Sequence, residues 1–234
     1  MADKVSIRID GELIEANEGM TLFEAAQMAG KFKAEIIPVE VPGSKGELNI
    51  VDADEGPRTD ASFAALSKLK SSFKTNGKVT AGNSSGMNDG ASAAVISSRS
   101  YAEKQKLKPL AKIVGYTQIA VEPKYLFASP SQAIPKLLKK IDWKLSSVDL
   151  IELNEAFAAQ VLANGHALAD QGWDWNKVNI HGGAIALGHP LGASGARMLT
   201  TLIYALKDRG LKRGLASLCL GGGEAVAMAI ELES

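Results

Sequence analysis

The chain has 234 residues, 46% hydrophobic and 22% charged, which is the composition of a globular protein with room for one large domain or two small ones. Its 26 basic residues balance 26 acidic ones, so no overall field favours nucleic acid or an anionic membrane, and we expect neither as a partner. A single cysteine excludes an internal disulfide and a thiolate metal cage, and no apolar run approaches the ~20 residues of a membrane span, so we expect a metal-free cytoplasmic protein.

The first thirty residues indicate a hairpin followed by a short helix. Residues 4–16 alternate apolar and polar side chains around Asp10-Gly11, the usual signal of a tight β-hairpin. Thr21 and Glu24 form a capping box, which predicts a helix that ends near Gly30. Residues 1–30 are therefore expected to be a separate piece.

The next segment, residues 31–106, is rich in turn residues. Proline, glycine and asparagine interrupt short apolar runs up to residue 83, and one helix is expected over 62–69. A polar cluster at 83–90 precedes a predicted strand over 91–97 and a helix that begins near Ser100.

From residue 107 the pattern alternates between strand and helix. The predicted strands cover 111–119, 148–153, 177–180, 215–220 and 225–232, and the predicted helices cover 130–140, 155–169 and the segment that carries Leu199, Leu202, Ile203 and Leu206. Residues 107–234 should therefore form an α/β layered domain with a mixed sheet covered by helices.

Three polar features follow predicted strands of this domain. Asn154 follows strand 148–153, His189 lies in a glycine-rich segment after strand 177–180, and Cys219 ends strand 215–220. Ligands of open α/β sheets collect at the carboxyl ends of strands, so we expect one shared site. A cysteine near a histidine can be a thiolate that acts as nucleophile or base, an asparagine can hold a water or a carbonyl oxygen, and the Gly221 N–H can stabilise an oxyanion.

Each of these features also has a purely structural interpretation. A lone cysteine in an apolar strand is usually core packing, glycine-rich turns are usually only turns, and Asn154 could simply cap its helix. We expect His166 and His181 to be structural. The combination of three such features at one sheet edge favours chemistry.

Three motifs resemble the C-terminal signatures of the thiolases, and their order and spacing match. They are Asn154-Glu155-Ala156-Phe157, Gly182-Gly183-Ala184 with Gly188-His189-Pro190, and Cys219-Leu220-Gly221-Gly222-Gly223. Residues 79–91 resemble the segment that closes the first thiolase domain, so the resemblance covers about residues 29–234. Residues 1–28 weakly resemble the start of a 2Fe-2S ferredoxin-like domain, without its cysteines.

The resemblance implies a reaction and a role for each site residue. Thiolases condense two acetyl-CoA molecules, or cleave a 3-ketoacyl-CoA with a second CoA, through an acyl-enzyme on a nucleophilic cysteine. By that likeness His189 would activate the nucleophile and donate into an oxyanion hole, where Asn154 would hold a water. Cys219 would exchange the α-proton of acetyl-CoA as acid or base, and the Gly221 N–H would serve a second oxyanion hole. No cofactor is implied beyond the CoA thioesters, which are substrates.

The resemblance also implies contacts to CoA. Arg58 matches the arginine at the nucleotide end, although a solvated loop charge is an equal interpretation, and Ser85 matches the serine that contacts pantetheine. Ala81, Leu126 and Phe157 match the apolar lining. Residues 123–130 depart from the Met-Gly-rich turn of many thiolases, which leaves the acyl-chain preference open.

The largest departure is the nucleophilic cysteine, which thiolases carry in an N-terminal half that has no counterpart here. We divide the sequence into residues 1–30 of non-thiolase character, residues 31–106 as a partial loop domain and the end of the first domain, and residues 107–234 as the thiolase C-terminal domain. Such a piece should expose a sheet edge and a helix layer, so we expect a homo-oligomer or a partner chain that carries the thiolase N-terminal half.

Three functions stay open at this point. The first is an acyltransferase subunit or fragment that is active only when another chain supplies the nucleophile. The second is a non-catalytic CoA-binding or scaffolding subunit, and the third is an inactive truncated thiolase remnant.

Overall fold

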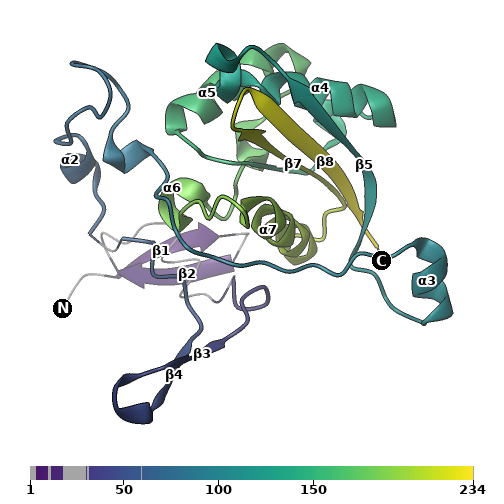
Figure 1. The fold of residues 1–234 in the computed structure, drawn as a ribbon, viewed down its shortest axis with the longest axis horizontal. Coiled ribbons are helices and arrows are strands. Elements are labelled where there is room, and N and C mark those ends of the chain that lie inside the picture. The colour runs from purple at the N-terminus through teal and green to yellow at the C-terminus, as the bar shows by residue number, and fades with distance from the viewer. Residues whose placement is uncertain (1–3, 10–11, 18–29, 31, 59, 234) are drawn as a thin grey trace. The chain divides into compact units, whose positions relative to one another are not determined.

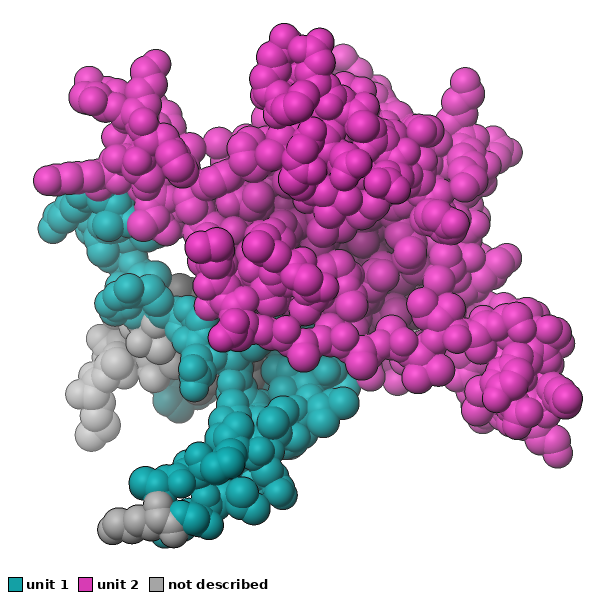
Figure 2. Space-filling model, viewed as in Figure 1, with its two compact units in different colours: residues 1–69 teal, residues 70–234 magenta. Residues whose placement is uncertain are grey.

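A computed structural model of the chain describes residues 4–9, 12–17, 30, 32–58 and 60–233. Two compact units make up the chain, residues 1–69 and residues 70–234, and Figure 2 marks them by colour. The helix predicted to end near Gly30 and the hairpin turn at Asp10-Gly11 lie outside the described residues. In the described part of the chain no helix is both long and apolar enough to cross a membrane.

The described residues of unit 1 form two β-hairpins and one helical turn. Its antiparallel pairs are β1 (Lys4–Ile9) with β2 (Glu12–Asn17), which confirms the predicted hairpin, and β3 (Val39–Pro42) with β4 (Leu48–Val51). The 3-10 turn η1 (Ser44–Gly46) joins the second pair. Helix α2 (Phe63–Leu66) is shorter than the predicted 62–69, with Ser62 as its cap. Phe63 is 89% exposed, so this helix buries no apolar face within the unit.

Unit 2 contains one four-stranded sheet with helices on both of its faces (Figure 1). The strand order is β5-β8-β7-β6, in which β6 and β7 are parallel and the other pairs are antiparallel, so the predicted mixed sheet is confirmed. The strands are β5 (Ala111–Ala120), β6 (Leu150–Leu153), β7 (Arg213–Leu220) and β8 (Glu224–Leu232). The α-helices are α3 (Arg99–Lys104), α4 (Pro130–Ile141), α5 (Ala158–Ala167), α6 (Ala184–Leu187) and α7 (Ser194–Asp208). The 3-10 turns are η2 (Ala81–Asn83), η3 (Pro123–Ala128), η4 (Leu145–Ser147), η5 (Ala169–Gln171) and η6 (Trp175–Lys177).

The core of unit 2 lies on the two faces of this sheet. Ile134 and Leu137 of α4 pack on one face, together with Leu215 of β7. Met198 and Leu202 of α7 pack on the other. Alternate residues of β7 serve the two faces, as the period of two in a strand requires. Helices thus pack on both faces of the strands whose ends carry the polar residues discussed below.

Both edges of the sheet are closed by side chains. At the β5 edge, Lys136 and Lys140 donate from Nζ to the carbonyls of Gln118 and Tyr116, at 3.1 and 2.9 Å. At the β6 edge, the side chain of Asn179 accepts from the Leu153 N–H and donates to the Leu153 carbonyl, each at 2.8 Å. Two carbonyls of the β5 edge and both backbone groups of Leu153 at the β6 edge are thereby occupied.

In unit 2, two predicted strands are absent, and one predicted helix is shorter. The strand expected over 177–180 is wrong because Asn179 adopts a left-handed φ of 47°, which leaves only a bridge from Val178 to Ile151. The strand expected over 91–97 is wrong because no described strand lies beside it to pair with it. The helix expected over 155–169 covers Ala158–Ala167, and its N-cap is Phe157.

Candidate active site

Asn154 lies directly after β6 and is held by the neighbouring strand. Its backbone N–H donates to the Ser217 carbonyl at 3.0 Å, which continues the parallel ladder by one residue. The residue is 2% exposed. Because Phe157 is the N-cap of α5, the interpretation of Asn154 as a helix cap is wrong, and its side chain is free for another task.

His189 is placed by a glycine turn and by the start of α7. Gly188 has φ +96°, a conformation that favours glycine, and a Cβ there would lie 2.3 Å from the Asn88 side-chain oxygen. The His189 N–H donates to the Gly86 carbonyl at 2.8 Å. The polar cluster at 83–90 therefore packs against the histidine loop.

A chain of hydrogen bonds joins Asn154, His189 and Ser194. The Asn154 Nδ2 atom is 3.4 Å from His189 Nε2, and His189 Nδ1 is 2.6 Å from Ser194 Oγ. Ser194 Oγ donates to the Pro190 carbonyl at 3.0 Å, so we assign the proton between serine and histidine to Nδ1. Nε2 then keeps its lone pair and accepts from the Asn154 amide. This is the tautomer that a proton acceptor at Nε2 requires.

The surroundings of His189 favour its neutral form. Burial lowers the pKa of His189, and the positive charge of Arg197 lowers it further. The buried Asn154 Oδ1 atom has no hydrogen-bond partner among the described residues. An unpaired buried amide oxygen is unusual and can accept a hydrogen bond from a water or a ligand. His189 thus presents a neutral imidazole, and Asn154 presents an unpaired acceptor, its Oδ1 atom.

Cys219 and Gly221 lie at the same carboxyl edge of the sheet. The register pairs Leu153 with Ser217, and Cys219 follows two residues later on the same strand. Burial raises the pKa of the Cys219 thiol, which favours the protonated form over the expected thiolate. A Cβ at Gly221 would meet no atom within 4 Å, so the backbone there faces open space. The tight turn that follows has Gly222 at φ +86°.

Glu155 supports the histidine segment, a role that the sequence analysis did not identify. Its carboxylate accepts from the Ile185 N–H and from Asn179 Nδ2, both at 3.0 Å. Gly183 lies so close that a Cβ would be 2.3 Å from the carboxyl carbon. Ser194 was also missed, although its position five residues after His189 and at a helix start was a usable signal. His166 is exposed on α5 and His181 is buried.

The residues matched to CoA contacts are divided between the two units. Ser85 and Phe157 are neighbours in unit 2, where Ser84 and Phe157 form a β-bridge and Ser85 Oγ donates to the Ala156 carbonyl at 3.2 Å. Arg58 belongs to unit 1, where its side chain binds Asp60 at 2.9 and 2.8 Å. Hydrogen bonding to Asp60 raises the pKa of Arg58. Ala81 is exposed on η2, and Leu126 is partly buried on η3.

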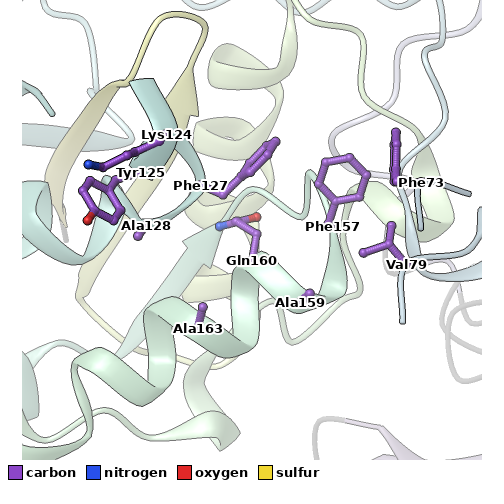
Figure 3. Close-up of a pocket in the computed structure, with 10 residues that line it drawn as sticks. All are labelled: Phe73, Val79, Lys124, Tyr125, Phe127, Ala128, Phe157, Ala159, Gln160 and Ala163. Carbon is purple, nitrogen blue, oxygen red and sulfur yellow. The ribbon is translucent and has the colours of Figure 1, made fainter. Parts of the chain in front are cut away.

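An apolar pocket of about 590 Å³ opens beside Phe157 (Figure 3). Phe157 makes edge contacts with Phe127 and Phe73, with ring centroids 5.1 and 6.0 Å apart. Lys124 stands over the Tyr125 ring, 4.9 Å from its centroid, where the pocket opens. The remaining lining residues are Val79, Ala128, Ala159, Gln160 and Ala163.

Gln160 is the single polar residue buried in this pocket's lining. The residue is 3% exposed, and Figure 3 shows its amide pointing from α5 toward the space between Phe127 and Phe157. Neither its Oε1 nor its Nε2 has a hydrogen-bond partner in the described part of the chain. Burying an amide without partners costs about 1–3 kcal/mol. This amide is the one buried polar group of the lining whose hydrogen-bonding capacity is unused among the described residues.

Comparison with known proteins identifies the family of the chain. Residues 107–232 match the thiolase C-terminal domain, and residues 16–100 match the thiolase N-terminal domain, so the match begins before residue 29. Acetyl-CoA acetyltransferases of Allochromatium vinosum and Chromobacterium violaceum are 50% and 52% identical to the chain over 208 and 207 residues. These alignments cover 89% and 88% of this chain and 52% of each relative.

Solved structures show the same likeness. The Bacillus anthracis acetyl-CoA acetyltransferase superposes with a TM-score of 0.86 at 44% identity, over 92% of this chain and 54% of that one. The human mitochondrial 3-ketoacyl-CoA thiolase gives a TM-score of 0.80 at 39% identity, over 90% of this chain and 52% of that one. The chain spans about half the length of these relatives. On the strength of both domain matches and these relatives, the chain belongs to the thiolase family.

Proposed function

We propose that this chain supplies the acid–base half of an acyl-CoA C-acyltransferase of the thiolase type, and that it binds the CoA arm of the substrate. The observation that carries the proposal is the hydrogen-bonded series Asn154, His189 and Ser194, which leaves a neutral Nε2 and an unpaired Asn154 Oδ1 at the carboxyl edge of the sheet. In the thiolase reaction, His189 Nε2 can take a proton and Asn154 Oδ1 can hold a water.

Thiolysis of a 3-ketoacyl-CoA breaks the bond between Cα and Cβ. A nucleophilic thiolate bonds to the β-carbonyl carbon, the electron pair of the broken bond passes to the α-carbon of the leaving acetyl-CoA enolate, and that carbon takes a proton. Cys219, a thiol at neutral pH because burial raises its pKa, is suited to give this proton and to recover it in the condensation direction. CoA then releases the acyl group as a new thioester.

His189 and Asn154 would act on the nucleophile and the carbonyl oxygen. With its Nε2 lone pair His189 can take the proton of an incoming thiol, and the resulting imidazolium can donate to the oxyanion. A water that is hydrogen-bonded to Asn154 Oδ1 would lie beside the same oxyanion, which forms from the substrate carbonyl. The nucleophile itself must come from outside the described residues, because the one cysteine of the chain is Cys219.

The pocket beside Phe157 suits the CoA arm. That arm is flexible and carries two amide groups between apolar methylenes, which matches a pocket of aromatic rings with one unsatisfied amide, that of Gln160. Ser85 lies near Phe157 and holds the preceding carbonyl, that of Ala156, through its hydroxyl. Phe127 lines the same pocket and stands in the turn where many thiolases have Met-Gly.

Binding without catalysis is the second candidate, and the pocket itself favours it. All of its lining residues belong to unit 2, so the described residues form it without the nucleophile. A CoA-binding subunit would need the pocket and not Cys219. Titration of CoA and acetyl-CoA into the chain, with Phe157→Ala and Cys219→Ala, tests binding alone: loss of affinity in the first variant and not in the second supports the pocket.

The catalytic proposal needs the other half of the fold. We would co-express the chain with the part of the A. vinosum relative to which it does not align, and assay thiolysis of acetoacetyl-CoA by the purified pair. General acid–base groups typically contribute about 10²–10⁴-fold to rate, so His189→Asn should slow the pair by that order. A purified pair that has no thiolase activity would refute the catalytic proposal. A His189→Asn variant as active as the wild type would refute the role of His189.

A further inference from the structure

The side-chain amide of Asn164 joins two elements that line the apolar pocket beside Phe157. Asn164 lies on α5, and both α5 and η3 contribute residues to the pocket lining. Its Nδ2 donates to the Phe127 carbonyl of η3 at 2.7 Å, and its Oδ1 accepts from the Ser131 N–H at 2.7 Å. In the described part of the chain, every hydrogen bond between residues 123–131 and α5 comes from this amide.

The bond to Ser131 replaces a missing helix cap. Ser131 lies in the first turn of α4, where a backbone N–H has no partner within the helix. The N-cap residue Ser129 makes no capping bond, because its hydroxyl donates to the carbonyls of Leu126 and Glu224. Asn164 therefore caps α4 from another helix, and Ser129 instead ties the same corner to β8.

Burial makes this amide hard to replace. Asn164 is fully buried, so water cannot take over its bonds. Its Nδ2 also donates to the Gln160 carbonyl at 2.8 Å, within α5. A leucine at position 164 would branch at the same carbon but would leave the Phe127 carbonyl and the Ser131 N–H buried without partners, which is costly. The amide of Gln160, one turn earlier on α5, has the opposite character, because it is unpaired and points into the pocket (Figure 3).

The amide of Asn164 also fixes the two rings that form the pocket wall. Phe127 belongs to η3, and Phe157 is the N-cap of α5. Their ring centroids are 5.1 Å apart at an interplanar angle of 89°. Hydrogen bonds within a 3-10 turn have poor geometry, so such a turn depends on bonds from outside it. The Asn164 bond to the Phe127 carbonyl holds the main chain of one ring against the helix that carries the other.

We propose that Asn164 is a positioning residue for the pocket, which keeps η3 against α5 and so sets the spacing of the Phe127 and Phe157 rings for the CoA arm. Asn164 is not among the described residues that line the pocket, and it acts through Phe127. The inference rests on the proposed function for the identity of the ligand. The positions of the two rings can be measured without any ligand.

Calorimetric titration of CoA into the chain tests the effect on binding. If Asn164→Leu leaves the wall closed in about one molecule in ten, the apparent affinity for CoA should fall about tenfold. Leu206→Ala is the matched control, because Leu206 is fully buried on the other face of the sheet, where it packs with Met198 and Leu202 of α7. That variant should lower the melting temperature and leave CoA affinity unchanged. Wild-type affinity in Asn164→Leu, or an equal loss in Leu206→Ala, would overturn the proposal.

NMR of the chain without ligand tests the position of the rings. The wild type should show a nuclear Overhauser cross-peak between the rings of Phe127 and Phe157, which Phe127→Leu assigns by removing it. Asn164→Leu should weaken this cross-peak, and Leu206→Ala should retain it. Circular dichroism checks folding. If Asn164→Leu does not fold, Asn164→Asp takes its place, since an ionised carboxylate keeps an acceptor for Ser131 but has no donor for the Phe127 carbonyl.

Failure of the positioning role and failure of the proposed function give different results. A wild-type chain that binds no CoA, with the cross-peak lost in Asn164→Leu, refutes the CoA site and supports the positioning role. A wild-type chain that binds CoA, with affinity and cross-peak both kept in Asn164→Leu, refutes the positioning role and leaves the CoA site standing.

Discussion

The most direct test of the histidine assignment is Ser194→Ala. The Ser194 hydroxyl is the partner of His189 Nδ1 at 2.6 Å, and Ser194 is 1% exposed, so water cannot readily replace it. The Pro190 carbonyl keeps two other donors, the N–H groups of residues 193 and 194, at 2.7 and 2.8 Å. The change therefore leaves one buried group unpaired, the imidazole Nδ1–H.

The size of the effect follows from that single group. An unsatisfied buried donor costs about 1–3 kcal/mol. For a unit of this size each kcal/mol lowers the midpoint of thermal unfolding by about 2–4 °C, so the variant should melt about 2–12 °C lower. A penalty of about 1.4 kcal/mol on the tautomer protonated at Nδ1 shifts the tautomer equilibrium of His189 tenfold toward the form protonated at Nε2. In that form the Nε2–H of His189 would face the Nδ2–H of Asn154, so that two donors would meet.

Nitrogen-15 NMR of the His189 ring measures the tautomer. The wild-type chain should show a protonated Nδ1 and an unprotonated Nε2, and Ser194→Ala should shift the population toward protonated Nε2. Ser129→Ala is the matched control, because Ser129 is fully buried and its hydroxyl donates to the Leu126 and Glu224 carbonyls at 2.6 and 3.0 Å. That variant should melt lower but keep the His189 spectrum. An unchanged His189 spectrum in Ser194→Ala would refute the assignment.

Three further predictions concern charge, packing and the thiol. Arg197→Met should raise the pKa of His189, because the arginine charge adds to burial in lowering it, and NMR titration would show the midpoint moving up. Since the folded-state pKa lies below the unfolded value near 6.5, the chain should lose stability as pH falls through the range below 6.5, and Arg197→Met should reduce this loss. Gly183→Ala should destabilise the unit by about 1–3 kcal/mol in denaturant unfolding, because a Cβ there would be 2.3 Å from the Glu155 carboxyl carbon. Alkylation of Cys219 should be slow at pH 7 and should rise with a midpoint above that of an ordinary cysteine, because burial raises its pKa.

Matched controls separate these effects from general damage. Lys207→Met removes an exposed cation from the last turn of α7 and should leave the His189 midpoint in place. Gly195→Ala has open space around the new Cβ and lies in a helix, so it should be neutral or stabilise by up to about 1 kcal/mol. Equal destabilisation by both glycine variants, or a Cys219 midpoint at the ordinary value, would contradict the packing and burial described above.

The sequence alone predicted most of the C-terminal layer and the identity of its polar residues. Hydrophobic periodicity predicted β5, β7, β8 and α4 to within a few residues, because each buries one face on a continuous core. It also predicted the existence of α7 from four of its apolar residues, without its bounds. It predicted that Asn154 and His189 share a site, but not the direct contact between their side chains, since their separation of 35 residues is bridged only by the tertiary fold.

The errors have identifiable physical causes. Residues 91–97 have strand character, but a strand needs a neighbour and none is described beside them. Asn179 replaces a strand at the β6 edge with its own side-chain hydrogen bonds, a substitution that periodicity cannot detect. The support that Glu155 gives to the loop at Gly183 depends on a close approach between segments 28 residues apart, and no local pattern signals it.

If Cys219 is an acid–base group and the nucleophile lies on the other half of the fold, the acyl-enzyme forms on the partner polypeptide. Intact mass spectrometry of the reconstituted pair, quenched in acid after mixing with acetyl-CoA, tests this most directly. The acetyl group should be found on the polypeptide derived from the relative, with this chain at its unmodified mass. An acetyl group on this chain at Cys219 would contradict the account.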